Sequence, residues 1–373
     1  MLALCHAMSD FYATTFTPLV ETFRSLFGMT LQGVSVIGAL LGIFGSMMQP
    51  LLGLWSDRAD RGKMAAIGLA ASAVFVGLIG LAPNAALLTL LLVAGSLGVA
   101  AFHPSSAVMA VREEATRSSA MALFMTGGGI GLALAPRVAT GIVEHAGLPW
   151  LWVIALPGVG LSVWLYRASR GEPRRPTAGR ALDWRALFAR GTGPLWALFG
   201  MATLRSLAVT AFAFYLSVLG KERGWGLEKS GSVLSGYMVC AVVGSLVGGF
   251  LADRMDRRVL IAGSCVLAAP FYFYFAASSG WASVPSFAMA GFLFSLATPV
   301  NVSLAQELRP QSASLLSGVM MGLAWGIASV LLTAVGALGQ WLGIGGALEV
   351  MAVLGALAAP FAALIPARRE SAR

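Results

Sequence analysis

Apolar and polar positions alternate along this chain on the scale of whole helices rather than of single residues. Twelve apolar runs of 19 to 28 residues are separated by short polar or Gly/Pro-containing breaks. A helix needs about 20 apolar residues to cross a bilayer, so each run predicts one membrane-spanning helix. The runs cover residues 2–23, 31–54, 64–82, 85–111, 118–143, 147–167, 193–220, 229–251, 259–277, 282–306, 313–340 and 344–366.

One long polar stretch divides the twelve runs into two sets of six. Residues 168–191 contain Pro173, Pro176 and many arginines, which is typical of a connection between two bundles. We therefore predict an all-α, multi-pass membrane protein in three parts. These are an N-terminal six-helix bundle over 1–167, a cytoplasmic linker over 168–191 and a C-terminal six-helix bundle over 192–373.

Composition and charge agree with a membrane protein. The chain is 58% hydrophobic and only 11% charged, whereas a soluble domain carries roughly a quarter charged residues. A net charge of +9 would suit nucleic acid, but its distribution argues against that partner. With a cytoplasmic N-terminus, 19 of the 25 Lys and Arg residues fall on the cytoplasmic side and four on the other. This bias predicts an inner-membrane protein with both termini in the cytoplasm.

The two halves share an internal repeat. His103-Pro104 in the fourth run has a counterpart in Thr298-Pro299 at an offset of 195. A second, longer element recurs at an offset of 196, and it predicts that the halves are parallel duplicates. In it Gly53, Asp57, Arg58, Asp60 and Arg61 recur as Gly249, Asp253, Arg254, Asp256 and Arg257.

Each copy of that longer element lies between the second and third runs of its half. A glycine lets neighbouring helices approach closely, and the aspartate can accept a hydrogen bond from a helix N-terminus or an arginine. We expect both copies, together with Glu307 and Arg309 after the tenth run, to form a cytoplasmic gate. The alternative is that these charges only follow the cytoplasmic bias of basic residues.

Further short stretches carry a family resemblance. The stretches are His6 with Asp10, Phe102-His103-Pro104, the glycines of 127–131 with Pro136, Ala268-Ala-Pro270-Phe271, and residues 305–310. With them the whole chain resembles the fosmidomycin-resistance efflux family of the major facilitator superfamily, and the repeated element resembles motif A of that superfamily. The resemblance implies a major facilitator fold with 12 transmembrane helices in two pseudo-symmetric six-helix bundles. It also implies drug efflux, antibiotic resistance and antiport.

Ionisable side chains inside the apolar runs are candidates for function, because each costs about 2.5–3.5 kcal/mol at bilayer depth. His6 and Asp10 are four residues apart and share a helix face. We expect Asp10 to face Arg205 in a central cavity, with a structural ion pair as the alternative. His103 is expected to carry a proton or to contact an anion, with a hydrogen-bonded packing role as the alternative. Arg137 is expected either to enter the cavity or to reach the membrane interface. The expected proton-coupling and substrate residues are His6, Asp10, His103, Arg137 and Arg205.

The sequence thus predicts a secondary active transporter that exports a small anionic molecule by proton antiport. The fosmidomycin-like substrate class follows from the resemblance. Proton-coupled uptake of an organic anion or metabolite is one alternative, and a non-transporting membrane sensor is another. No nucleophile–base set, nucleotide motif, metal-ligand spacing or cofactor motif is recognised, so we expect no enzyme. The expected partners are the substrate, protons and lipid, with the protein as a monomer.

Overall fold

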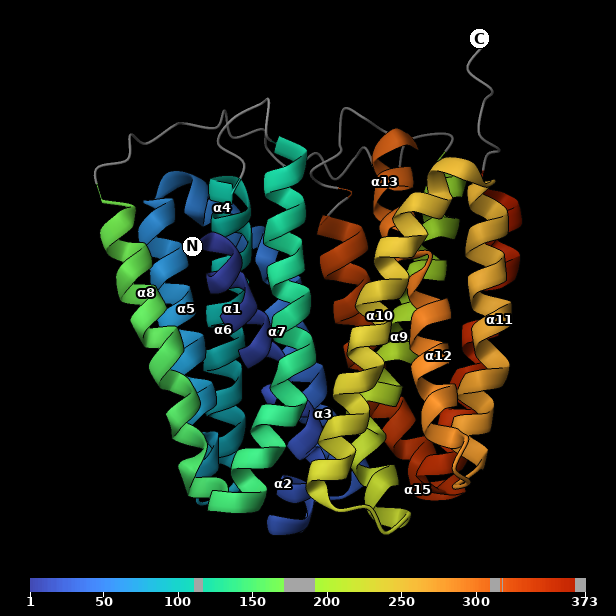
Figure 1. Ribbon diagram of the computed structural model, residues 1–373, viewed down its shortest axis with the longest axis horizontal. Coiled ribbons are helices and arrows are strands. Elements are labelled where there is room, and N and C mark those ends of the chain that lie inside the picture. Colours follow the sequence, from blue (N-terminus) through green and yellow to red (C-terminus); the bar gives the residue numbers. More distant parts are fainter. Residues whose placement is uncertain (111–116, 171–191, 309–315, 317, 366–373) are drawn as a thin grey trace. The chain divides into compact units, whose positions relative to one another are not determined.

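The protein is helical throughout the part of the chain that the structure describes (Figure 1). Ten of its helical segments are long and apolar enough to cross a membrane. The predicted all-α, multi-pass membrane fold is therefore confirmed. The computed structural model describes residues 1–110, 117–170, 192–308, 316 and 318–365.

The described chain forms two compact units, and each is described by itself. The first unit consists of Met1–Gly179 and Ala213–Ser235. Its α1, α5, α6, α7 and α8 lie side by side in Figure 1. Its helices are α1 (Leu2–Thr15), α2 (Val20–Leu26), α3 (Leu31–Gly42), α4 (Gln49–Arg58), α5 (Arg61–Gly77), α6 (Ala85–Ala110), α7 (Arg117–Ala146) and α8 (Ala155–Ala168).

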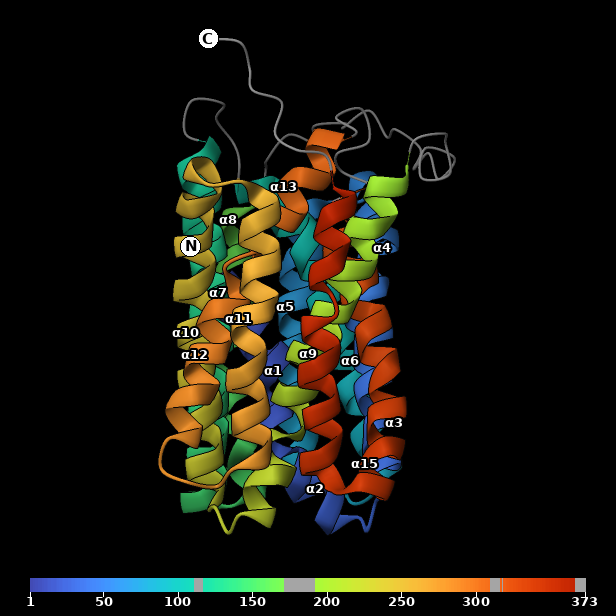
Figure 2. The ribbon, with the colours of Figure 1, turned by 90° about the vertical axis from the view of Figure 1, so that its right-hand side faces the viewer.

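The second unit consists of Arg180–Phe212 and Gly236–Arg373. In it α11 packs against both α12 and α15 (Figure 2). Two long helices, α9 and α10, contribute to both units. The helices are α9 (Gly193–Glu222), α10 (Leu227–Arg254), α11 (Arg257–Ala277), α12 (Ser283–Ser295), α13 (Thr298–Leu308) and α15 (Ala324–Ala356). The predicted bundle boundaries stay a prediction, and most of the predicted linker lies outside the described residues.

Three of the twelve predicted spans are not separate members of the ten. The first is divided between α1 and α2, which are joined by a short 3₁₀ turn at Thr17–Leu19. The last two merge into one segment, Val319–Leu364, of 46 residues, about twice the length that one span needs. Gly343 interrupts that segment with a φ of 73°, a conformation that glycine adopts at little cost. The helices thus have room for twelve crossings.

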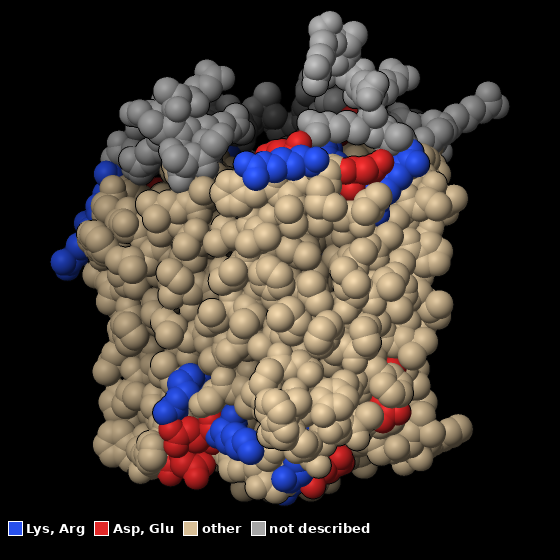
Figure 3. Space-filling model, turned by 45° about the vertical axis from the view of Figure 1, so that its right-hand side comes forward, with Lys and Arg blue, Asp and Glu red and all other residues tan. Residues whose placement is uncertain are grey.

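Charged side chains are distributed as a membrane protein requires. On the face drawn in Figure 3 they gather toward two opposite ends, and an uncharged band lies between them. Many exposed large side chains are apolar, Ile67, Phe250 and Val259 among them. An apolar outer surface of this kind is stable against lipid tails and unfavourable in water.

Glycines bring α1 and α7 into direct contact in the first unit. A Cβ at Gly127 would collide with the carbonyl oxygen of Ala3, and one at Gly131 with that of Ala7. Small residues at a helix interface permit such backbone approach in membranes. The glycine-rich stretch is therefore a helix-packing surface.

Candidate functional site

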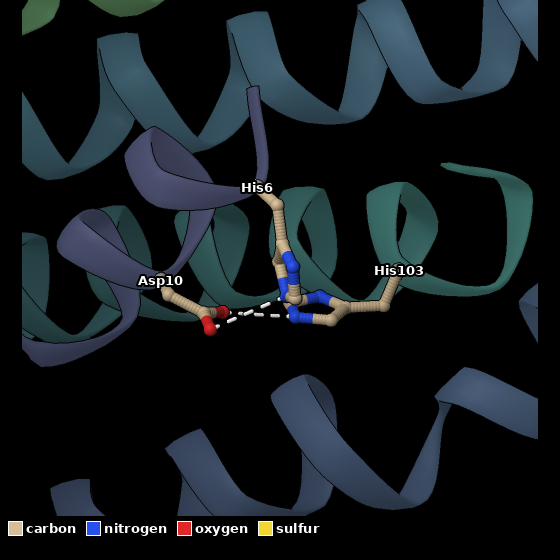
Figure 4. Close-up of side chains that lie close together, drawn as sticks. All are labelled: His6, Asp10 and His103. Atoms are coloured by element: carbon tan, nitrogen blue, oxygen red, sulfur yellow. Dashed lines mark hydrogen bonds and ion pairs between the residues drawn. The ribbon is translucent and has the colours of Figure 1, made fainter. Parts of the chain in front are cut away.

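Three ionisable side chains meet inside the first unit (Figure 4). Asp10 of α1 places its Oδ1 2.9 Å from His103 Nε2 of α6. Its Oδ2 lies 3.3 Å from His6 Nε2, one turn away on α1. His6, Asp10 and His103 are called the triad below. The predicted common face of His6 and Asp10 is confirmed, and His103 joins it because α6 packs against α1.

Hydrogen bonds to the backbone fix the tautomers of both histidines. His6 Nδ1 lies 2.7 Å from the carbonyl oxygen of Phe124, and His103 Nδ1 lies 2.9 Å from that of Val99. A carbonyl oxygen only accepts, so each Nδ1 must carry the proton. In the neutral ring Nε2 then presents a lone pair to the Asp10 carboxylate. Two lone pairs and an anion repel one another, so the triad requires a cation between them.

The surroundings hold the triad rigid but leave one side accessible. The His6 ring stacks on Phe124 at 4.0 Å between centroids, and its side chain is 4% exposed. Gly128 of α7 lies against it, since a Cβ there would be 2.5 Å from Asp10 Oδ2. The side chains of Asp10 and His103 are 14% and 23% exposed.

The triad also has the composition of a metal-ligand set. Its ligand atoms all lie within 4.8 Å of one another, and no second group of three such side chains occurs within the described ranges. Two imidazole nitrogens and a carboxylate oxygen suit transition metals. The sequence pattern could not show this set, because His103 lies 93 residues after Asp10.

Arg205 of α9 is a buried cation in the second unit. Its side chain donates to Ser264 Oγ at 2.9 Å and to Cys265 Sγ at 3.0 Å, and also to the carbonyl oxygen of Phe294. The guanidinium carbon lies 4.2 Å from the centre of the Phe294 ring. None of the partners that the structure describes for Arg205 is a carboxylate. The predicted pairing of Arg205 with Asp10 stays a prediction.

Arg137 has an acidic partner of its own. Its guanidinium forms an ion pair with Glu228 at the start of α10. His145 lies 3.6 Å from the same carboxylate, near the end of α7. The Arg137 side chain is 48% exposed. The role expected for Arg137, in the cavity or at the interface, stays a prediction.

Both copies of the repeated element cap a helix. Asp60 accepts a hydrogen bond from the backbone N–H of Lys63 at 3.1 Å, and Asp256 accepts one from Arg258 at 2.8 Å. Each is therefore the N-cap of the helix that follows, α5 or α11. Asp57, Arg58 and Arg309 belong to the predicted gate, but their side chains lie outside the described part of the structure.

One gate contact connects two predicted gate residues in the second unit. Arg257 of α11 donates to Glu307 of α13 at 2.5 Å, although the Glu307 side chain is 56% exposed. Exposed ion pairs contribute little to stability, typically under about 1 kcal/mol. Such a pair can therefore form and break at low cost, which a gate requires.

The expected role of the gate glycines is confirmed at one position and wrong at the other. A Cβ at Gly53 would lie 3.3 Å from the side chain of Pro104, so α4 approaches α6 closely there. A Cβ at Gly249 would meet nothing within 4 Å. The contact between α10 and α12 instead uses Gly244 and Gly248, where a Cβ would collide with carbonyl oxygens of α12 and its C-cap. Gly249 lies about 100° further round the helix than Gly248.

An ion-pair cluster around the buried Glu21 was not predicted from the sequence. Glu21 of α2 is 7% exposed and forms ion pairs with Arg24 at 2.6 Å and with Lys221 of α9 at 3.0 Å. Ser25 donates to the same carboxylate at 2.7 Å. The i, i+3 spacing of Glu21 and Arg24 was the available signal. The pairing with Lys221 had no such signal, because Lys221 is distant from Glu21 in the sequence.

A comparison with known proteins matches the chain to a protein family. The model of the Major Facilitator Superfamily matches residues 2–333 and 230–373. The uncharacterized MFS-type transporter YfnC of Bacillus subtilis (strain 168) is 24% identical over 350 residues, 91% of this chain and 85% of that protein. The fosmidomycin resistance protein of Escherichia coli (strain K12) is 24% identical over 338 residues, 87% of this chain and 82% of that protein.

Solved structures share the fold at low sequence identity. A bacterial homologue of the human lysosomal transporter Spinster, inward-facing and occupied, superposes with a TM-score of 0.79 at 14% identity. The match covers 97% of this chain and 95% of that one. A D-xylose–proton symporter gives a TM-score of 0.77 at 15% identity, over 98% of this chain and 96% of the other.

Proposed function

Because the chain belongs to the Major Facilitator Superfamily, we propose that it exports a small anionic molecule by alternating access, in exchange for protons. The fosmidomycin resistance protein among its relatives supports efflux of a phosphonate or a similar drug or metabolite. We place the protein in the bacterial inner membrane as a monomer with both termini in the cytoplasm. The distribution of basic residues supports that orientation.

The surroundings of Arg205 support an anionic substrate. The side chain is 5% exposed, and its described hydrogen-bond partners are a hydroxyl, a thiol and a backbone carbonyl. A buried guanidinium without a counter-charge is costly, and an anion that enters its surroundings gains a charge-assisted, bidentate partner. A carboxylate or phosphonate fits this geometry, whereas a neutral sugar gains far less.

The energy source is proposed to be the proton gradient. The sequence shows no nucleotide-binding motif, so an ion gradient must drive uphill transport. The triad requires a cation in the membrane-spanning part of the first unit, and we propose that it accommodates the coupled ion. Movement of that ion inward and of the substrate outward constitutes antiport.

Flux through the purified protein in liposomes tests this function. We expect fosmidomycin and small organic anions to move with a counter-flow of protons, and neutral analogues to move slowly. Arg205→Gln should lower anion flux at least about tenfold, because the substitution removes the buried guanidinium that binds the anion. Arg167→Gln, at the exposed end of α8, is the matched control and should retain wild-type flux.

Two results would contradict the proposal. Equal transport of anionic and neutral compounds, with wild-type flux in Arg205→Gln, would show that Arg205 does not form an anion site. Protons that move in the same direction as the substrate would establish uptake instead of export. Asp10→Asn, measured in the same liposomes, should abolish proton movement, since the triad then lacks its anion.

A further inference from the structure

We propose that the triad is a binding site for a divalent transition-metal ion of the zinc, cobalt and nickel class. His6 Nε2, His103 Nε2 and one carboxylate oxygen of Asp10 are its ligands. The site goes beyond the proposed transport, because it follows from the geometry of the first unit and can be measured without a substrate.

The separations between the ligand atoms fit a common ion. Zinc lies about 2.0–2.2 Å from imidazole nitrogen and carboxylate oxygen. Ligands around a tetrahedral or octahedral ion at that distance are about 3.0–3.5 Å apart. The Asp10 oxygens lie 2.9 Å from His103 Nε2 and 3.3 Å from His6 Nε2. All three ligand atoms lie within 4.8 Å of one another, so the side chains must rotate to bring them onto one ion.

Both histidines already have the outer hydrogen bonds of metal ligands. A metal-bound histidine almost always donates its other ring N–H to a carbonyl or carboxylate, which fixes the ring and directs the free lone pair toward the ion. His6 donates to the carbonyl of Phe124 and His103 to that of Val99. These contacts are made by ring nitrogens on the far side from Asp10.

The choice of metal follows from the ligand types. Calcium and magnesium prefer oxygen ligands in larger numbers, whereas two imidazoles and one carboxylate suit zinc, cobalt, nickel and ferrous iron. The partial exposure of Asp10 and His103 leaves room for water to complete the coordination. A bound metal occupies the place of the coupled proton, so such ions should inhibit transport.

Cobalt titration of the detergent-purified protein, made without a polyhistidine tag, tests the site. We expect one Co²⁺ per chain, seen as visible d–d absorption, and displacement of it by Zn²⁺. His103→Gln and Asp10→Asn should each weaken binding by more than about tenfold. His145→Ala removes an exposed histidine at the other end of α7 and should leave the spectrum and the affinity unchanged.

The outcomes separate this site from the proposed function. A wild-type protein that binds no Co²⁺ or Zn²⁺, or binding that survives both His103→Gln and Asp10→Asn, would overturn the metal site. Circular dichroism of each variant verifies that it is folded, and the wild-type titration decides the question if a variant does not fold. Anion flux measured without metal decides the proposed function independently, whereas loss of flux on adding micromolar Zn²⁺ supports the metal site.

Discussion

His6 and His103 each donate one ring N–H to a backbone carbonyl and direct the other nitrogen toward Asp10. The arrangement requires a cation, because the free-energy cost of a buried carboxylate that faces two lone pairs is high. Arg205 presents the opposite case in the second unit, where a cation is surrounded by neutral acceptors. At the residue scale these two environments are the basis of the proposed cation and anion sites.

Gly128 determines whether the triad can form. We expect Gly128→Ala to destabilise the protein by about 1–3 kcal/mol, because the new methyl group overpacks the site. It should also abolish Co²⁺ binding, since the Cβ would lie 2.5 Å from Asp10 Oδ2 and 2.6 Å from His6 Cε1. Thermal unfolding in detergent and the cobalt titration measure both effects.

Gly160→Ala is the matched control for that substitution. Gly160 lies inside α8, and a Cβ there would meet nothing within 4 Å. Alanine should be neutral or stabilise by up to about 1 kcal/mol, because it has the higher helix propensity. Equal melting temperatures for the two variants would show that Gly128 does not shape the site.

Only part of the site could be predicted from the sequence. His6 and Asp10 were joined by their helical spacing, which is a local property. His103 became their partner only through the packing of α6 against α1, and no single-sequence pattern encodes that contact. The Glu21 cluster was missed for the same reason, because its ion pair with Lys221 spans 200 residues.

At the scale of helices, hydrophobic runs predicted most elements closely and missed their interruptions. The run 85–111 became α6, Ala85–Ala110, and the run 259–277 became α11, Arg257–Ala277. The run 282–306 instead forms α12 and α13, with a break just before Pro299. Proline lacks the N–H that would continue the helix, and Arg205 hydrogen-bonds the Phe294 carbonyl beside the break. Apolar length alone cannot reveal such a break.

Adjacent glycines on α10 provide a test of how this helix packs on α12. Gly248→Ala would place a methyl group against the carbonyl oxygen of Leu296, where backbone rather than a flexible side chain must move. We expect a loss of about 1–3 kcal/mol, seen as a lower melting temperature. Gly249→Ala has the same helix propensity and open space around it, so it should not destabilise. A larger loss for Gly249→Ala would contradict this contact.

At the scale of the whole molecule, duplication gives the two halves a common framework and different chemistry. Asp10 and Arg205 occupy nearly equivalent positions of the repeat, at an offset of 195. The first unit adds His103 next to its carboxylate, and the second surrounds its guanidinium with neutral acceptors. The pattern of the repeat predicted the common framework, and only the packed helices revealed how each charge is partnered.

The orientation of the whole chain in the membrane can be tested with single cysteines. The distribution of basic residues predicts that the exposed Ala168 of α8 lies on the cytoplasmic side and that the exposed Ser279, between α11 and α12, lies outside. The background has its three native cysteines replaced by serine, which keeps an acceptor for Arg205 at position 265. In this background we expect a membrane-impermeant maleimide to label Ser279→Cys in intact cells. Ala168→Cys should be labelled only after permeabilisation. The reverse pattern would place the termini outside and would contradict the proposed orientation.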